Sequence, residues 1–238
     1  MSDERQAPPP SGAEQALIRV VKQHVDGLRA FGLSAVPRTG QAGVTAEPDA
    51  ASNSSRLAQL AQGVERCRRC PLHRTRTHAV VSDGTPEARL VFIGEAPGRD
   101  EDLQGKPFVG AAGRLLTKMI EAMGLRREEV YICNVLKDRP PANRTPLPEE
   151  VEACLPFLRE QLAIIRPAVI CTLGAVAAKA LLGPHVAITK IRGDVRDYEG
   201  IPLVPTFHPA YLLRNPPAKK FVWIDLQKVK QLLEADAG

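Results

Sequence analysis

Three loops of polar residues, each directly after a short apolar run, carry the groups with which this 238-residue sequence could do chemistry. The loop 94–102 is rich in glutamate and aspartate, the second loop begins with the amide of Asn134, and the third contributes the imidazole of His208. Acids at the end of a strand beside a lone aromatic, here Phe108, suit a pocket that holds a flat polar ring and activates or steers water. We therefore predict one pocket for such a ring.

The glycines of the first loop allow a second interpretation, a phosphate-binding loop. Its sequence is GEAPGRDED. A phosphate cradle has the pattern GxxxxGK[ST] or GxGxxG opening directly into a helix, and the acids inside this loop would repel a phosphate. Nucleotide binding is therefore the weaker hypothesis.

Asn134 and His208 also have plainer interpretations. An amide offers one acceptor and two donors in a plane, as reading the edge of a base requires. An asparagine at the end of a strand, however, often only forms a turn. A single histidine would mean equally little, so the functional hypothesis depends on three polar loops meeting at one edge of a sheet.

Alternating strand-like and helical segments are expected to position these loops. The strand-like runs are 90–93, 130–132, 169–173 and 203–204, and the helical periods are 115–123, 151–165, 175–182 and 221–233. Short buried strands separated by helices predict a three-layer α/β/α domain with a central, mostly parallel sheet. In such sheets the ligand lies beyond the carboxyl ends of the strands, where the three loops begin.

The first 55 residues have a different composition. A proline run opens them, and residues 34–55 are mostly Ala, Gly, Pro, Thr, Asn and Ser, which is typical of a linker. Between these stretches, residues 11–31 predict one amphipathic helix. We expect 1–55 to be an extension and 56–238 the functional domain. The helix either binds a partner on a tether or, as we favour, packs as an accessory on its own domain.

Composition narrows the class of protein. No apolar run reaches the length of a membrane span and the first residues lack the order of a signal peptide, which predicts a cytoplasmic protein without a membrane partner. The net charge of +5 is compatible with nucleic acid. Five cysteines without a secretory signal favour buried, catalytic or metal-bound thiols.

Cys67 and Cys70 form a CxxC pair, which by itself is compatible with zinc, an iron–sulfur cluster or a redox pair. Cys133 and Cys171 lie in the apolar strands and are expected to be small core residues. Because neighbours on a strand alternate, Cys133 should face away from Asn134.

Three motifs resemble the family 4 uracil-DNA glycosylases, the iron–sulfur branch of the uracil-DNA glycosylase superfamily. They are GEAPGRDEDLQGKPFVGAAGRLL at 94–116, NVLKDRPPANRTPLPEE at 134–150 and FHPAYLLRNP at 207–216. The resemblance extends from about Cys67 to the last helix. It implies a DNA repair enzyme that flips uracil out of DNA and hydrolyses its N-glycosidic bond, without cutting the strand.

The resemblance also implies roles for single residues. Phe108 would stack on the flipped uracil, Asn134 would read its Watson–Crick edge, and His208 would donate a hydrogen bond to O2. Gly94 and Ala96 belong to the base-binding loop.

Two acids of that loop receive roles in the same way. Better-known branches of the superfamily carry a water-activating aspartate at the position of Ala96, so we assign the general base to Glu95. Glu101 is then expected to guard the C5 side of the pocket, where thymine carries a methyl group.

Basic residues near these motifs are candidate phosphate contacts, and a leucine is expected to fill the space left by the flipped base. The candidates are Arg68, Arg69, Arg139, Arg144 and Arg214, with Leu212 or Leu213 as the wedge. The alternative function is an iron–sulfur protein that binds uracil-DNA without catalysis or traps it covalently. Covalent trapping is associated with an inserted basic loop and an extra histidine, and residues 139–147 contain neither.

The family pattern places its third and fourth cluster cysteines where this chain has Asp138 and Cys154. Three explanations are open: Asp138 ligates the fourth iron of a 4Fe–4S cluster, that iron is water-bound or lost, or no cluster forms. We favour the first. Zinc held by Cys67, Cys70, Cys154 and Asp138 is the alternative. Whether it is an iron–sulfur cluster or zinc, the metal would be structural.

The protein is expected to act as a monomer on nucleoid DNA.

Overall fold

The computed structural model of the chain describes residues 52–236. The helix expected within 11–31 and the linker up to residue 51 lie outside these residues. The first described helix, α2 (Asn53–Glu65), begins three residues before the predicted domain boundary. The side chain of Ser52 caps it by accepting a hydrogen bond from the backbone of Ser55 at 3.3 Å.

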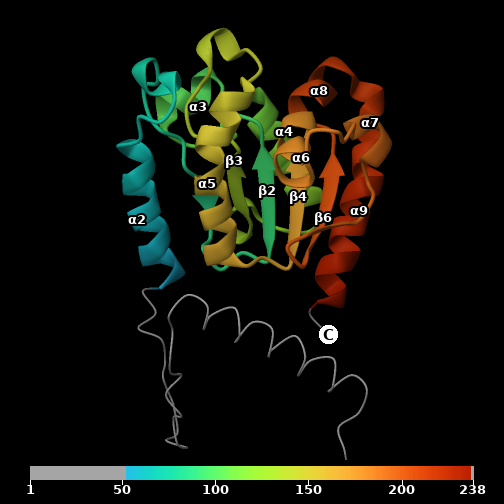
Figure 1. Ribbon diagram of the computed structural model, residues 1–238. Coiled ribbons are helices and arrows are strands. Elements are labelled where there is room, and N and C mark those ends of the chain that lie inside the picture. Colours follow the sequence, from blue (N-terminus) through green and yellow to red (C-terminus); the bar gives the residue numbers. More distant parts are fainter. Residues whose placement is uncertain (1–51, 237–238) are drawn as a thin grey trace, which may run out of the picture. The chain divides into compact units, whose positions relative to one another are not determined.

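A six-stranded sheet forms the centre of the domain, in the order β1-β3-β2-β4-β6-β5 (Figure 1). The strands are β1 (Asp83–Gly84), β2 (Leu90–Gly94), β3 (Tyr131–Asn134), β4 (Val169–Leu173), β5 (Arg196–Tyr198) and β6 (Ile201–Thr206). The four inner strands are parallel, and the two short edge strands are antiparallel to their neighbours. The predicted three-layer class is confirmed, while the sequence pattern missed both edge strands.

Helices cover both faces of the sheet. Apolar residues of α2, α5 (Pro148–Ile165) and α6 (Ala175–Leu182) pack on one face. Those of α4 (Ala111–Ala122), α8 (Pro209–Arg214) and α9 (Lys219–Ala235) pack on the other. Alternate strand residues supply the two cores, since Val91 and Ile93 lie in the first and Leu90 and Phe92 in the second.

The remaining elements are short and connect these layers. They are α3 (Arg99–Gln104), α7 (Ile188–Ile191), and the 3₁₀ turns η1 (Pro71–Arg74), η2 (Arg127–Glu129), η3 (Pro141–Asn143) and η4 (Pro216–Ala218). Helices α3 and α8 occupy segments that the sequence suggested as loops. Six residues are too few to show helical periodicity, which explains why both were missed.

The strand register aligns the three polar loops. Gly94 at the end of β2 pairs with Asn134 at the end of β3. Leu173 of β4 pairs with Thr206, two residues before His208. The loops therefore leave the sheet at the same edge, as predicted.

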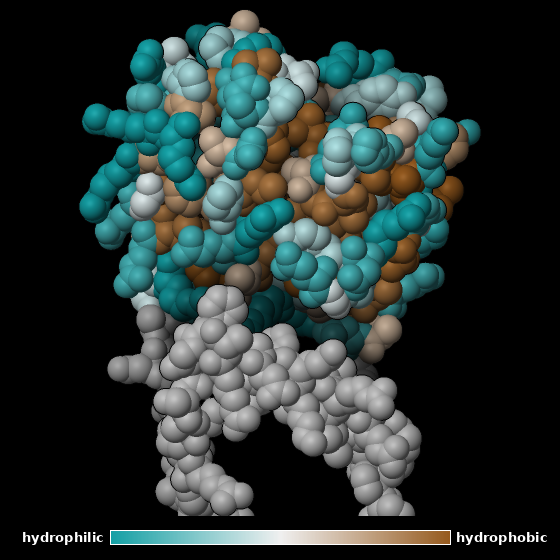
Figure 2. All heavy atoms as spheres, viewed as in Figure 1, coloured by the Kyte–Doolittle hydropathy of each residue, from teal (hydrophilic) through white to brown (hydrophobic). Residues whose placement is uncertain are grey.

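Figure 2, viewed from the same side as Figure 1, shows hydrophilic residues over much of the surface and hydrophobic residues exposed between them. Hydrophobic residues also reach the surface near the right-hand edge, where Figure 1 shows α7 and α9. No helix within residues 52–236 is long and apolar enough to cross a bilayer.

Candidate active site

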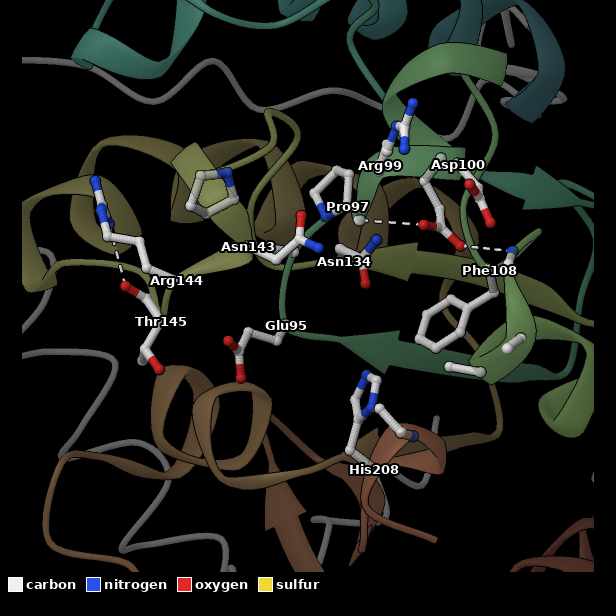
Figure 3. A pocket seen from close by; sticks show the side chains of 18 of the residues that line it. Glu95, Pro97, Arg99, Asp100, Phe108, Asn134, Asn143, Arg144, Thr145 and His208 are labelled. Carbon is white, nitrogen blue, oxygen red and sulfur yellow. Dashed lines mark hydrogen bonds between the residues drawn. The ribbon is translucent and has the colours of Figure 1, made fainter. Parts of the chain in front are cut away.

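A pocket of about 600 Å³ lies at the carboxyl ends of the inner strands. Its walls include side chains from all three polar loops, and in Figure 3 those of Glu95, Phe108, Asn134 and His208 point into one cavity. Ala96, Glu101, Arg144 and Arg214 also line it. The structure thus brings together residues that lie more than a hundred positions apart in the sequence.

Phe108 forms the aromatic wall of the pocket. Its backbone is left-handed, with φ 53°, a conformation that bulky residues rarely adopt. A Cβ at Gly113 would overlap the backbone of Phe108, so helix α4 approaches that residue closely only because position 113 is glycine. The Phe108 ring lies 5.6 Å from the imidazole of His208, with 29° between the planes.

Gly94, the last residue of β2, leaves room for two side chains of the pocket. A Cβ at this position would overlap both the ring of Phe108 and the amide of Asn134. The sequence placed Gly94 in the base-binding loop, and the structure gives the physical reason: the aromatic ring and the amide occupy the space a side chain would take.

Asn134 presents a buried amide to the pocket. Its side chain is only 2% exposed, and within residues 52–236 its Oδ1 has no hydrogen-bond partner. A buried polar atom left without a partner costs about 1–3 kcal/mol, which a ligand with a matching donor would remove. The turn-forming interpretation does not account for an amide in this position.

His208 enters the pocket as a neutral imidazole. Burial, together with the positive charge of Arg214, lowers its pKa to about 4. Its Nδ1 lies 3.1 Å from the backbone nitrogen of Ala210 and accepts that hydrogen bond, as the N-cap of α8. The proton of the neutral ring is therefore on Nε2, which is free to donate.

The two acids of the first loop differ in their surroundings. Burial raises the pKa of Glu95, whose side chain points into the pocket (Figure 3). Glu101 instead accepts three backbone hydrogen bonds, from Gly98 at 3.1 Å, Val109 at 3.0 Å and Gly110 at 2.9 Å. These bonds tie the start of α3 to the segment that follows Phe108, which favours a positioning role for Glu101 over a guard at C5.

Lys137 lies beneath the end of β3. Lys137 is 1% exposed, so it cannot contact a DNA phosphate in this conformation. Its Nζ donates to the backbone oxygen of Asn134 at 2.7 Å and to Gln161 Oε1 at 2.5 Å. No periodicity marks such a lysine in the sequence, since its side-chain partner Gln161 lies in the distant helix α5.

The five arginines expected to contact DNA differ in their surroundings, and two of them, Arg144 and Arg214, line the pocket. Arg144 pairs with Glu150 at 2.8 Å, and Arg139 Nε donates to Asn143 at 2.6 Å. Arg214 is exposed at the end of α8. Arg68 is also exposed, while the guanidinium of Arg69 lies 4.1 Å from the ring centroid of Phe157.

Only one of the two candidate wedge leucines is exposed. Leu212 is 1% exposed and belongs to the core between the sheet and α9, so its prediction as a wedge is wrong. Leu213 is 47% exposed on the outer side of α8. Adjacent helix positions face different directions, and the sequence alone did not show which one faced the core.

The candidate metal residues Cys67, Cys70, Asp138 and Cys154 line a second, smaller pocket. Their donor types suit a metal, but residues 52–236 contain no group of three or more side chains arranged to hold one ion. Asp138 is engaged by Arg76, whose Nη1 lies 2.8 and 3.0 Å from its two carboxylate oxygens. The sequence gave no signal for this partner, 62 residues away.

Cys133 and Cys171 are fully buried in the two cores, as predicted. Cys133 packs on the side of α5, whereas the amide of Asn134 lies near Phe108 on the opposite side.

At the ends of its parallel strands, this α/β/α domain carries an aromatic wall, a neutral imidazole and a buried amide whose oxygen has no partner within residues 52–236. Such a site places the domain in the class of proteins that enclose a single planar base. Residues 81–227 match the Uracil DNA glycosylase superfamily. The chain belongs to this superfamily.

Relatives within the superfamily cover most of the described domain. The chain is 49% identical to the Type-4 uracil-DNA glycosylase of Thermotoga maritima, over 74% of this chain and 94% of that protein. It is 45% identical to the Type-4 uracil-DNA glycosylase of Archaeoglobus fulgidus, over 74% of this chain and 92% of that protein. A Type-5 uracil-DNA glycosylase of Pyrobaculum aerophilum is 31% identical over 65% of this chain and 75% of that protein.

Proposed function

We propose that this chain is a DNA repair enzyme that flips uracil out of DNA and hydrolyses its N-glycosidic bond, leaving an abasic site. The observation that carries the proposal is the buried amide oxygen of Asn134, which has no hydrogen-bond partner within residues 52–236 and lies in a pocket with Phe108 and the neutral imidazole of His208. Uracil-containing DNA is the substrate, and the strand itself is not cut.

Recognition of the base follows from the amide. Asn134 Oδ1 accepts from uracil N3–H while its amide nitrogen donates to O4. Cytosine has an acceptor at N3 and an amino group at C4, so the same amide would meet an acceptor with its oxygen and a donor with its nitrogen. A buried site that mismatches its ligand in this way rejects it strongly.

Cleavage requires charge to be stabilised on the departing base. When the bond between C1′ and N1 breaks, its electron pair stays on uracil and negative charge develops at O2. His208 is suited to donate from Nε2 to that oxygen because its Nδ1 is fixed as the acceptor from Ala210. Water then bonds to C1′ and gives a proton to Glu95, the carboxylate that faces the cavity.

We also propose that Cys67, Cys70 and Cys154, with Asp138 at the fourth corner, hold a 4Fe–4S cluster. The support is that three thiols and a carboxylate, suitable donors for iron, line one pocket. Asp138 is already paired with Arg76, so to ligate iron its carboxylate would either serve both groups or release Arg76. Bound there, the cluster would cross-link the segment after α2 to the start of α5 and the loop after β3. Zinc on the same residues is the alternative.

Release of free uracil from a uracil-containing oligonucleotide tests the proposed activity. The expected result is one free uracil and one alkali-labile site per uracil, with many turnovers per enzyme molecule. A stable protein–DNA adduct, or one that borohydride traps, would instead support the covalent alternative. Binding without release would support a non-catalytic module.

Gel filtration tests the predicted monomer, and cell fractionation tests its cytoplasmic, nucleoid-associated location.

A further inference from the structure

A second groove lies next to the proposed uracil pocket, on the other side of α8. Its volume is about 350 Å³. Its lining comes from α7, α8, η4 and α9 and from residues directly next to these elements and to β6, and includes Arg192, Phe207, Tyr211, Lys220 and Phe221. Tyr211 lines both this groove and the uracil pocket, so the two are neighbours.

Aromatic rings dominate the groove. The rings of Phe207 and Tyr211 lie 5.0 Å apart, tilted by 48°. The guanidinium of Arg192 lies 5.6 Å from the ring centroid of Phe207 and 5.2 Å from that of Phe221. Tyr211 and Phe221 are both exposed, so their rings are open to a ligand.

Hydrogen bonds fix Arg192 beside the aromatic rings of the groove. Arg192 Nε donates to Asp225 at 3.0 Å and Nη2 donates to the backbone oxygen of Phe221 at 2.6 Å. Asp225 accepts a further hydrogen bond from Thr206 at 2.6 Å, at the end of β6. The aromatic groups are therefore positioned before any ligand arrives, which lowers the entropic cost of binding.

The charge of the groove favours an anionic partner. None of the described residues that line it is acidic. The Lys220 Nζ lies 5.1 Å from the ring centroid of Phe221, and Lys220 has no ion-pair partner among residues 52–236. Exposed Arg214, on the wall of the uracil pocket, adds positive charge on the other side of α8.

We propose that this groove binds an unpaired nucleobase of the same DNA strand, flanking the flipped uracil, by stacking on Phe221 and Tyr211. The proposal rests on the proposed function. Aromatic faces with nearby cations and no acids are the features that bind single strands without regard to sequence. Because stacking requires an unpaired base, the groove selects single-stranded or frayed flanks.

The test uses Phe221→Ala, with Trp223→Ala as the matched control. Trp223 lies on the same helix and is 42% exposed, compared with 41% for Phe221, but it does not line the groove. Each protein is assayed on single-stranded oligonucleotides whose uracil carries long flanks, or flanks trimmed on either side to the minimum that is still cleaved.

The expected result is about a tenfold rise in KM for Phe221→Ala on the long-flank substrate, the effect of one lost stacking contact. Its kcat and its KM on the minimal substrate should match those of the unmodified enzyme and of Trp223→Ala. Equal behaviour of both variants on every substrate would overturn the groove while leaving the glycosylase activity intact. Absence of uracil release by the unmodified enzyme from all substrates would instead overturn the proposed function.

A second arm separates base stacking from charge. Flanks in which the bases are removed and the phosphates retained should bind the unmodified enzyme about tenfold more weakly than normal flanks. If they bind equally well, the groove contacts only the backbone and the stacking proposal fails. Lys220→Gln should lower the salt dependence of binding by roughly one phosphate contact, and an unchanged salt slope would contradict the role given to that cation.

Discussion

At the scale of single residues, the pocket combines hydrogen-bonding groups that are neutral near pH 7 with the carboxylate of Glu95. Asn134 is buried and His208 is partly buried, and the low pKa of His208 keeps its ring uncharged. Neutral donors can stabilise a developing anion directly, because they hold no counter-ion that must first be displaced. The following two predictions concern these side chains.

Asn134→Asp should reduce uracil release and relax discrimination against cytosine. An ionised carboxylate offers no donor to uracil O4 but can accept from the cytosine amino group. Losing the hydrogen bond to O4, which leaves that oxygen buried without a partner, costs roughly 3 kcal/mol, or about a hundredfold in kcat/KM for uracil. The measurement is the kcat/KM for uracil and for cytosine release. If both are unchanged, Asn134 does not read the base.

The acid side of the pH–rate profile should come from Glu95. Burial raises the pKa of Glu95, so the base becomes protonated and the rate falls as the pH drops through that raised value. His208 contributes nothing between pH 5 and 8 because its pKa is about 4. Glu95→Gln should remove this acid limb and lower kcat by about a hundredfold or more. An unaltered limb in the variant would assign it to another group.

At the scale of elements, tight approaches between strand ends and a helix set the shape of the pocket. Glu101 connects the start of α3 to the backbone after Phe108, and Gly113 lets α4 pack directly against that residue. Lys137 supports the backbone of Asn134 from below. The left-handed backbone of Phe108 is held by these contacts, because a strained conformation persists only where its surroundings determine it.

Gly94→Ala should abolish most uracil excision, since the added methyl group overlaps the Phe108 ring and the Asn134 amide. Misplacement of a reacting group by about 1 Å can cost about a hundredfold in rate. The control is Gly63→Ala in α2, where a Cβ comes no closer than 3.9 Å to Phe157 and should stabilise the helix by up to about 1 kcal/mol. Full activity of Gly94→Ala would show that the pocket repacks.

At the scale of the whole molecule, the proposed metal residues connect segments that the sheet does not tie together. Cys67 and Cys70 follow α2, Asp138 follows β3, and Cys154 lies in α5. In the described structure the ion pair between Arg76 and Asp138 makes one of these connections.

Asp138→Cys should retain or increase the iron bound per chain, because thiolate is the softer ligand. Arg76 keeps its hydrogen bonds to the carbonyls of Val64 and Glu65, so losing the carboxylate need not release it. The measurement is iron and sulfide per chain in anaerobically purified protein, with Cys133→Ala as a buried control that should change nothing.

Three results would contradict an iron–sulfur cluster with Asp138 at its fourth corner. Iron lost from Cys133→Ala but not from Asp138→Ala would make Cys133 the ligand. Iron lost only on removing Cys154 would indicate a three-cysteine cluster with an open corner. Zinc in place of iron and sulfide would favour the structural alternative.

The sequence by itself determined the layered fold and the three loops of the pocket. Buried parallel strands are continuous apolar runs, so 90–93, 130–132 and 169–173 were recognisable without any tertiary information. The parallel order then placed Glu95, Asn134 and His208 at one edge of the sheet. Short edge strands and the six-residue helices α3 and α8 escaped because they bury too few residues to show a period.

Only the tertiary structure decided how individual polar and apolar side chains are used. It placed Leu212 in the core and Leu213 outside, buried Lys137 beneath Asn134, and gave Glu101 three backbone partners. It also paired Asp138 with Arg76 and lowered the pKa of His208. Burial and hydrogen-bond partners come from residues distant in the chain, and a local pattern carries no record of which side chain they will meet.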